Sequence, residues 1–161
     1  MPKKSTAPFV LSEPLLNAFD TNDRINQYLL DNLPAEAWRA EPPAKKGRNI
    51  AGIVAHMHNV RLMWLKAAGG KLPEQLDKST VTPAQAKKAL DQSRVALREL
   101  LQTSLAGDGR VKRFRPDAAS FIGYLIAHDA HHRGQITMLA RQSGHAIPQK
   151  ATFGMWEWGV R

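Results

Sequence analysis

Two histidines four residues apart, His128 and His132, are the residues of this sequence with the clearest potential for chemistry. Four residues make about one helical turn, so in a helix both imidazoles leave the same face about 5–6 Å apart. Such a pair can share one metal ion and would provide half of a four-coordinate site. The pair interrupts a line of core residues with helical spacing, namely Phe121, Leu125 and Leu139, and polar groups on such a line need a partner.

A third imidazole is expected from the apolar run 50–64, which carries His56 and His58. The residues on one helical stripe with His56 are Ile53, Met57, Val60, Met63 and Trp64. His58 falls about 100° round from Met57, toward the flank of this stripe. His56 is therefore the predicted third ligand. Three neutral imidazoles with an open coordination position are typical of a catalytic zinc-type site, because structural sites close with four protein ligands.

Further polar residues lie close to these histidines in the expected helices. Asn22 and Asn26 share the buried stripe of the first helix, so we expect them to hydrogen-bond a metal ligand, a water or a substrate; capping a neighbouring helix or lining a wet bundle end is the alternative. Arg133 is a candidate contact for substrate or for a second subunit, with an exposed charge as the alternative. Asp129 could orient an imidazole or act as a base, but its position one residue from His128 points it off the metal face, so we predict that it is solvated.

Capping signals and helix-ending residues divide the chain into helical stretches. The predicted stretches run from Ser12 as N-cap to Leu33, from Asn49 as N-cap to Gly69-Gly70, from Thr82-Pro-Ala-Gln85 to about Ser104, and from about Asp117 to Gln142. Alternation with period two is missing, so strands are minor or absent. The sequence predicts an all-α, up-and-down four-helix bundle, in which inward side chains of facing helices can build a metal site.

Composition places these helices in a single domain of 161 residues, with 43% apolar residues for a core. The absence of cysteine excludes disulfides and thiolate ligands and fits a reducing cytoplasm. Residues 1–8 lack the apolar centre of a signal peptide, and no run reaches the roughly 18 apolar residues of a membrane span. We expect a soluble cytoplasmic protein with a loose N-terminal segment over 1–10. Its tail residues Trp156 and Trp158 are expected to cover the bundle, with an interface role as the alternative.

The net charge of +9 includes two local concentrations of basic residues, at 45–48 and 110–115. If the second and fourth helices run parallel, as in an alternating bundle, both loops lie at one end and form a positive rim above the metal. Our hypothesis is that this rim attracts an anionic small molecule; a general contribution to solubility is the alternative. Nucleic acid is not the favoured partner, because no recognition motif accompanies the charge.

A divalent ion with open positions could acidify a bound water or hold a thiolate, so the predicted site supports hydrolysis or thiol-dependent transfer and isomerisation. The arrangement His-Glu-x-x-His, in which glutamate serves as the base of many zinc hydrolases, is missing, and this mildly favours thiol chemistry. A non-catalytic metal-binding stress-response protein and a DNA-associated protein remain alternatives. Three histidines accept nickel, zinc, manganese or iron alike.

Most of the chain resembles the DinB-like (DinB/YfiT) metalloenzyme family. The resemblance rests on Leu33-Pro34, Gly47-Arg-Asn-Ile50, the spacing of His56, Arg61 and Trp64, the segment His128-x-x-x-His132-Arg-Gly-Gln135, Gly144-His145 and Trp156-Glu-Trp-Gly159. It implies a four-helix bundle of unusual hand, a three-histidine site for a divalent metal, commonly nickel or zinc, and a homodimer. A few relatives use low-molecular-weight thiols, as mycothiol-dependent isomerases or bacillithiol transferases. The family takes its name from DNA-damage-inducible expression.

Overall fold

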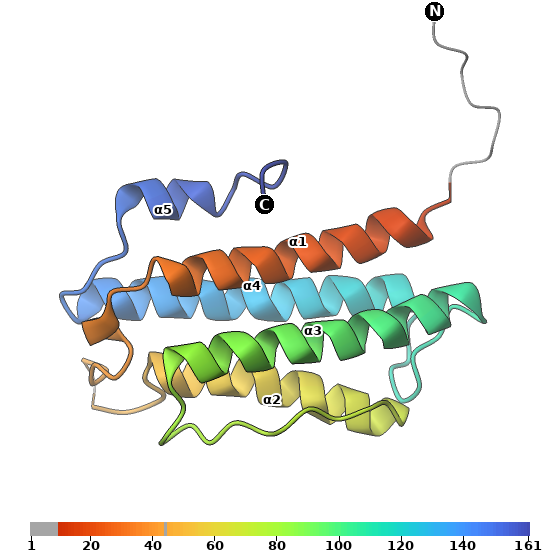
Figure 1. Ribbon diagram of the computed structural model, residues 1–161, viewed down its shortest axis with the longest axis horizontal. Coiled ribbons are helices and arrows are strands. Elements are labelled where there is room, and N and C mark those ends of the chain that lie inside the picture. The colour runs from red at the N-terminus through yellow and green to blue at the C-terminus, as the bar shows by residue number, and fades with distance from the viewer. Residues whose placement is uncertain (1–9, 44) are drawn as a thin grey trace, which may run out of the picture.

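The computed structural model describes residues 10–43 and 45–161, and these form a bundle of four long helices with a short helix beside it (Figure 1). The helices are α1 (Ser12–Asp31), the 3-10 turn η1 (Ala35–Ala37), α2 (Ile50–Ala68), α3 (Pro83–Ala106), α4 (Ala118–Gln142) and α5 (Gln149–Gly154). The described residues contain no strand beyond one isolated bridge. The predicted all-α four-helix bundle is confirmed. The loose segment expected over 1–10 lies, except for Val10, outside the described residues.

Three helices begin at the side-chain caps that the sequence predicted. The side chain of Asn49 accepts from the backbone of Gly52 at the start of α2, and Asp117 caps α4 in the same way. Thr82 and Gln85 form a reciprocal capping box at the start of α3. Gly69 ends α2 in the left-handed region, with a φ of 81° that suits glycine. These boundaries follow from local chemistry, which is why the sequence alone located them.

The limits of α1 differ from the prediction by one residue at its start and two at its end. Ser12 is the first helical residue and not the N-cap; Leu11 occupies the N-cap position and makes no side-chain hydrogen bond. The helix ends at Asp31, with Asn32 as C-cap, and not at Leu33. Proline at position 34 disfavours helical backbone at Leu33, so the helix ends before that residue.

The long helices run in the order up, down, down, up. Trp64, near the end of α2, packs on Phe121, near the start of α4, so these two helices are antiparallel. Helix α3 runs parallel to α2, because the connection 69–82 returns along the whole bundle before α3 begins (Figure 1). The expectation that α2 and α4 run parallel is therefore wrong. The direction of α3 depends on the path of this long connection. Capping residues mark where helices begin and end, and they do not indicate the path between them.

Two apolar clusters fill the bundle, one toward each end. One includes Leu29, Ile53 and Leu90, and the other includes Phe19 and Phe121. Between them lies a layer of buried polar side chains, contributed by all four long helices: Asn22, Asp23, Asn26, His58, Arg61, Ser93, Asp129 and His132. Buried polar groups are costly unless they are paired, so this layer is where a function is to be sought. Among the described residues, no helix combines the length and apolar character needed to cross a membrane.

The short helix α5 lies along α1 (Figure 1). Its buried side is made by Ala151 and Gly154, and a side chain at position 154 would overlap the ring of Tyr28. The tryptophans that follow are turned outward: Trp156 is 79% exposed and Trp158 is 40% exposed. The expectation that these rings cover the bundle is therefore wrong, because the small residues of α5 make the contact with α1.

Candidate metal centre

Three imidazoles from two helices converge on one point. His56 comes from α2, and His128 and His132 come from successive turns of α4; the nearest nitrogens of the three rings all lie within 4.8 Å of one another. The Nε2 atoms of His128 and His132 are 3.2 Å apart. Two nitrogens that bind one zinc ion tetrahedrally, at about 2.0–2.1 Å each, are about 3.3 Å apart. The structure thus brings together the three histidines that the sequence singled out, with a spacing that suits a shared cation.

The electrostatic surroundings keep these rings in the form that can bind a cation. Burial and the nearby guanidinium of Arg48 lower the pKa of His56 to about 4. Burial also lowers the pKa of His132, against the opposing effect of its hydrogen bond to Gln135. Both rings are consequently neutral at neutral pH. A neutral imidazole has a free lone pair, which is the form that a metal ion requires.

Gln135 fixes the orientation of His132. Its Oε1 lies 2.8 Å from Nδ1 of His132, one helical turn away on α4. An amide oxygen can only accept, so Nδ1 carries the proton and Nε2 presents its lone pair toward His128. Hydrogen bonds of this kind are the usual support of a metal-binding histidine. No role for Gln135 was predicted from the sequence, although its position three residues after His132 was the available signal.

Asp129 is buried, in contrast to the predicted solvated position. It is 1% exposed, and its Oδ2 accepts from Nδ2 of Asn22 at 2.8 Å, from Nδ2 of Asn26 at 2.9 Å and from Nη2 of Arg61 at 2.8 Å. The prediction was wrong because it treated the buried face of α4 as one narrow stripe. In the bundle α4 packs against both α1 and α2, so its buried face is wide enough to include Asp129 beside His128.

Asn22 and Asn26 join Asp129 to Arg133. While their amide nitrogens donate to the carboxylate, their Oδ1 atoms accept from Nη1 of Arg133 at 2.7 and 2.6 Å. Arg133 is therefore half-buried and engaged, and the exposed charge considered as an alternative is excluded. Asn22, Asn26 and Arg133 are connected to the imidazoles through Asp129. The Oδ1 atom of Asp129 lies 3.9 Å from Nδ1 of His128.

Arg61 supplies the charge that makes the polar layer possible. Its guanidinium donates to Asp23 at 2.7 Å as well as to Asp129, and it also donates to the carbonyl of Leu90. Burial alone would raise the pKa of Asp129, but Arg61 and the hydrogen bonds around the carboxylate hold it well below its usual range. Burial raises the pKa of Asp23 despite the same arginine. The two carboxylates in turn raise the pKa of Arg61, which stays charged.

His58 lies on a different face of α2 from His56, and there it is fully buried. Its Nδ1 lies 3.2 Å from Oγ of Ser93, and its Nε2 lies 2.8 Å from the carbonyl oxygen of Glu74. Both ring nitrogens are occupied, and burial lowers the pKa of this ring. His58 ties the connection 69–82 and α3 to α2. The choice of His56 over His58 for the cluster agrees with the geometry.

Comparison with known proteins identifies the family. A model of the DinB family matches residues 1–158. The chain belongs to the DinB family. A crystal structure of a DinB-like protein from Bacillus cereus ATCC 10987 superposes with a TM-score of 0.68 at 24% identity, over 84% of this chain and 95% of that one, and supports the same fold. A search of the curated proteins found no match.

The two basic concentrations of this DinB-family chain lie at opposite ends of the bundle. Residues 45–48 precede α2 and residues 110–115 precede α4, and these helices are antiparallel. The predicted common rim is therefore wrong. Arg48 alone among them is close enough to affect the pKa of His56. Of the two predicted concentrations, the one at 45–48 thus lies at the end of the bundle near the imidazole cluster, and the one at 110–115 does not.

Proposed function

We propose that this DinB-family protein binds one divalent transition metal ion through His56, His128 and His132 and uses it to act on a small molecule. The observation that carries this proposal is the convergence of three ring nitrogens from two helices, with two of them 3.2 Å apart. Among the described residues, no fourth histidine or carboxylate joins the group. Three protein ligands leave coordination positions for a substrate, and nickel and zinc are the ions we propose.

The polar layer supports this role by holding the ligands in place. Gln135 fixes the proton on Nδ1 of His132, and Asp129 lies against the Nδ1 side of His128. Arg61 anchors Asp129 from α2, the helix that also carries His56. The imidazoles are thereby tied to α1, α2 and α4 together. A preorganised set of ligands of this kind binds a cation without reorganising the bundle.

The surroundings favour chemistry that needs no protein base. A divalent ion at this position would supply Lewis acidity, which lowers the pKa of a coordinated water or thiol. The carboxylate nearest to the imidazoles, Asp129, accepts three hydrogen bonds and has a low pKa, so it is a poor base. A thiol that is acidified by the cation needs no such base. We therefore propose a thiol-dependent transferase or isomerase ahead of a hydrolase.

The metal content of untagged protein tests the proposed binding of one divalent ion. We expect about one nickel or zinc ion per chain by mass spectrometry, and loss of the ion in His56→Ala and His132→Ala. His131→Ala is the matched control, because this neighbouring histidine is exposed and outside the cluster. Added metal at a hundredfold excess over its dissociation constant should stabilise the fold by about 2.7 kcal/mol. A parent protein that retains no transition metal would overturn the proposal.

Enzymatic function is tested with a panel of thiols and electrophiles, followed with metal-loaded protein and with the His132→Ala variant. We expect thiol transfer or isomerisation that depends on the loaded ion. If the metal-loaded protein accelerates neither these reactions nor ester hydrolysis, the enzyme proposal fails. The protein would then be a non-catalytic metal-binding protein.

A further inference from the structure

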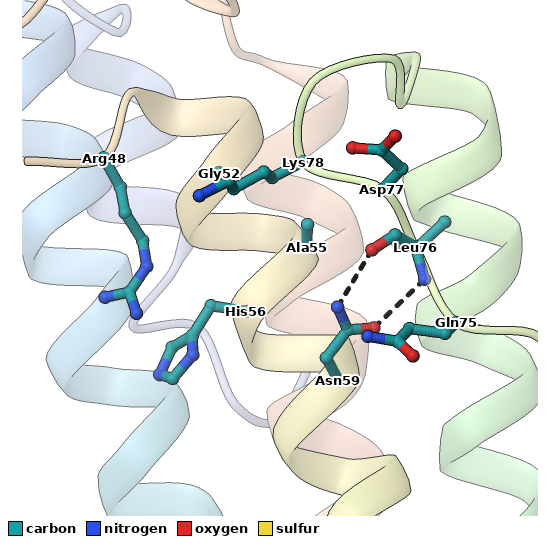
Figure 2. Close-up of a pocket in the computed structure, with 9 residues that line it drawn as sticks. All are labelled: Arg48, Gly52, Ala55, His56, Asn59, Gln75, Leu76, Asp77 and Lys78. Carbon is teal, nitrogen blue, oxygen red and sulfur yellow. Dashed lines mark hydrogen bonds between the residues drawn. The ribbon is translucent and has the colours of Figure 1, made fainter.

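A pocket of about 540 Å³ opens beside His56 (Figure 2). One wall is made by Arg48, which precedes α2, and by Gly52 and His56 on α2 itself. The other wall is the segment 75–78 of the long connection between α2 and α3. Because His56 belongs both to the imidazole cluster and to this lining, a molecule in the pocket lies next to the proposed metal ion. The pocket is the natural place for the part of a substrate that does not react.

The wall formed by the connection is held firmly against α2. Asn59 donates to the carbonyl oxygen of Leu76 at 2.9 Å and accepts from its amide at 3.0 Å (Figure 2). Next to Asn59 on α2, the buried ring of His58 lies 2.8 Å from the carbonyl oxygen of Glu74. The pocket is consequently formed before any ligand arrives, which limits the entropy lost on binding.

Two cations extend into this pocket. Arg48 reaches from the start of α2 toward His56, and Lys78 reaches from the opposite wall across Gly52 (Figure 2). Within the described part of the chain, neither of them forms an ion pair. The lining also holds a carboxylate, Asp77, whose Oδ1 accepts from the amide and the hydroxyl of Ser79. These hydrogen bonds lower the pKa of Asp77, and Lys78 and Arg39 lie close enough to lower it further, so its charge offsets part of theirs.

The positive region continues past Gly52. A second hollow of about 390 Å³ shares Arg48, Gly52 and Lys78 with the first and extends to Arg39. Glycine at position 52 leaves the space between the two cations free of a side chain. The first turn of α2 lies here, and a helix N-terminus adds partial positive charge. The second hollow also contains Glu41, whose negative charge repels an anion. The most favourable place for an anion is therefore the section between Arg48, Gly52 and Lys78 that both hollows share.

We infer that the substrate carries an anionic group, a carboxylate or a phosphate, which Arg48 and Lys78 bind while its reacting end reaches the imidazole cluster. This inference rests on the proposed metal-dependent function and adds the substrate class to it. The planar fork of Arg48 suits the paired oxygens of either group, and Lys78 adds a point charge. Neutral or cationic molecules of the same size lack this contact.

The test uses full-length protein loaded with cobalt(II) and short thiols that differ in their distant group. Mercaptopropionate and mercaptoethylphosphonate are anionic, mercaptoethanol is neutral and cysteamine is cationic. Binding is followed by the near-ultraviolet charge-transfer band from thiolate to cobalt. Because a charge-assisted hydrogen bond contributes about 1.5–3 kcal/mol, we expect the anionic thiols to bind about tenfold or more tightly than mercaptoethanol, and cysteamine to bind least. The affinity for mercaptopropionate compared with that for mercaptoethylphosphonate shows whether the site prefers a carboxylate or a phosphate-like group.

Variants then assign the preference to residues. Arg48→Gln and Lys78→Gln, each saturated with cobalt, should reduce the ratio of anionic to neutral affinity, and the double variant should abolish it. The ratio is the readout because Arg48 also lowers the pKa of His56, so its loss changes the affinity for every thiolate alike. Lys46→Gln is the matched control, because it removes a neighbouring exposed charge that lines neither hollow. The inference is overturned if the parent binds all four thiols equally or if the double variant keeps the preference. Failure to bind cobalt at all overturns the proposed function together with it.

Discussion

The guanidinium of Arg61 and the carboxylate of Asp129 form an ion pair of 2.8 Å in which both side chains are almost completely excluded from solvent. The pair links α2 to α4 at the level of the imidazole cluster, and a second buried pair from Arg61 to Asp23 extends it to α1. A buried charge is tolerated only when it is paired and hydrogen-bonded. Arg61 is therefore the residue that pairs both buried carboxylates of the polar layer.

Replacing Arg61 by methionine should strongly destabilise the fold. The variant leaves Asp23 and Asp129 buried without their shared counter-charge, and breaking a buried pair in this way costs about 3–5 kcal/mol. The free energy of unfolding from urea titrations of the metal-free protein measures this loss.

The matched control is Lys87→Ala, which removes an ion pair with Asp31 on the bundle surface. Exposed pairs of this kind contribute less than about 1 kcal/mol. Equal stability of Arg61→Met and the parent would show that the polar layer is not held by Arg61.

The sequence predicted well those features of the fold that depend on neighbouring residues. Asn49, Thr82 and Asp117 cap helices through hydrogen bonds to residues three positions later. Because these contacts are local, the residue types in the sequence are enough to predict them. The direction of α3 was missed because it depends on the path of the connection 69–82. At about 3.3 Å per extended residue, that segment is long enough to return along a helix of about 28 Å, so its length was the available indication.

The buried charges were missed for a different reason. Asp23, Arg61 and Asp129 each look like surface residues when one helix is considered alone, because burial of a charge is unfavourable without a partner. The partners stand on three different helices and meet only in the assembled bundle. The three histidines were found because metal binding accounts for imidazoles on apolar stripes, whereas no such reason was available for the charged residues.

Substitution of His56 and of His58 should separate metal binding from stability. His56→Gln should lose metal binding and keep the unfolding temperature of the metal-free parent, because His56 is half-exposed and the metal-free bundle does not depend on its ring. His58→Gln should keep the metal and unfold at a lower temperature, because it disturbs two buried contacts, to Ser93 and to the Glu74 carbonyl. Metal content and thermal unfolding of both variants give the comparison. The same pattern in both variants would contradict the separate roles assigned to these histidines.

The homodimer implied by the family resemblance stays a prediction. The surface that we expect to take part includes Phe153, Trp156 and Val160, which are 63%, 79% and 76% exposed. Aromatic side chains are enriched in interfaces, and truncating one near the centre can cost 2 kcal/mol or more. Light scattering after size exclusion should give a dimer for the parent and a monomer for Phe153→Ser combined with Trp156→Ser. A parent that is monomeric at all concentrations contradicts the prediction.

Gln135 should tune metal affinity without contributing much to the fold. Gln135→Leu removes the acceptor that holds the proton on Nδ1 of His132, so the ring can rotate and change tautomer. Loss of such a supporting hydrogen bond typically weakens metal binding about 10- to 100-fold. Competition with a chromophoric chelator measures the affinity. Thr137→Ala is the control on the same helix, because its hydroxyl bonds only the backbone carbonyl of Gly134. If Gln135→Leu and Thr137→Ala bind the metal equally well, the amide does not orient His132, and packing alone sets the position of the ring.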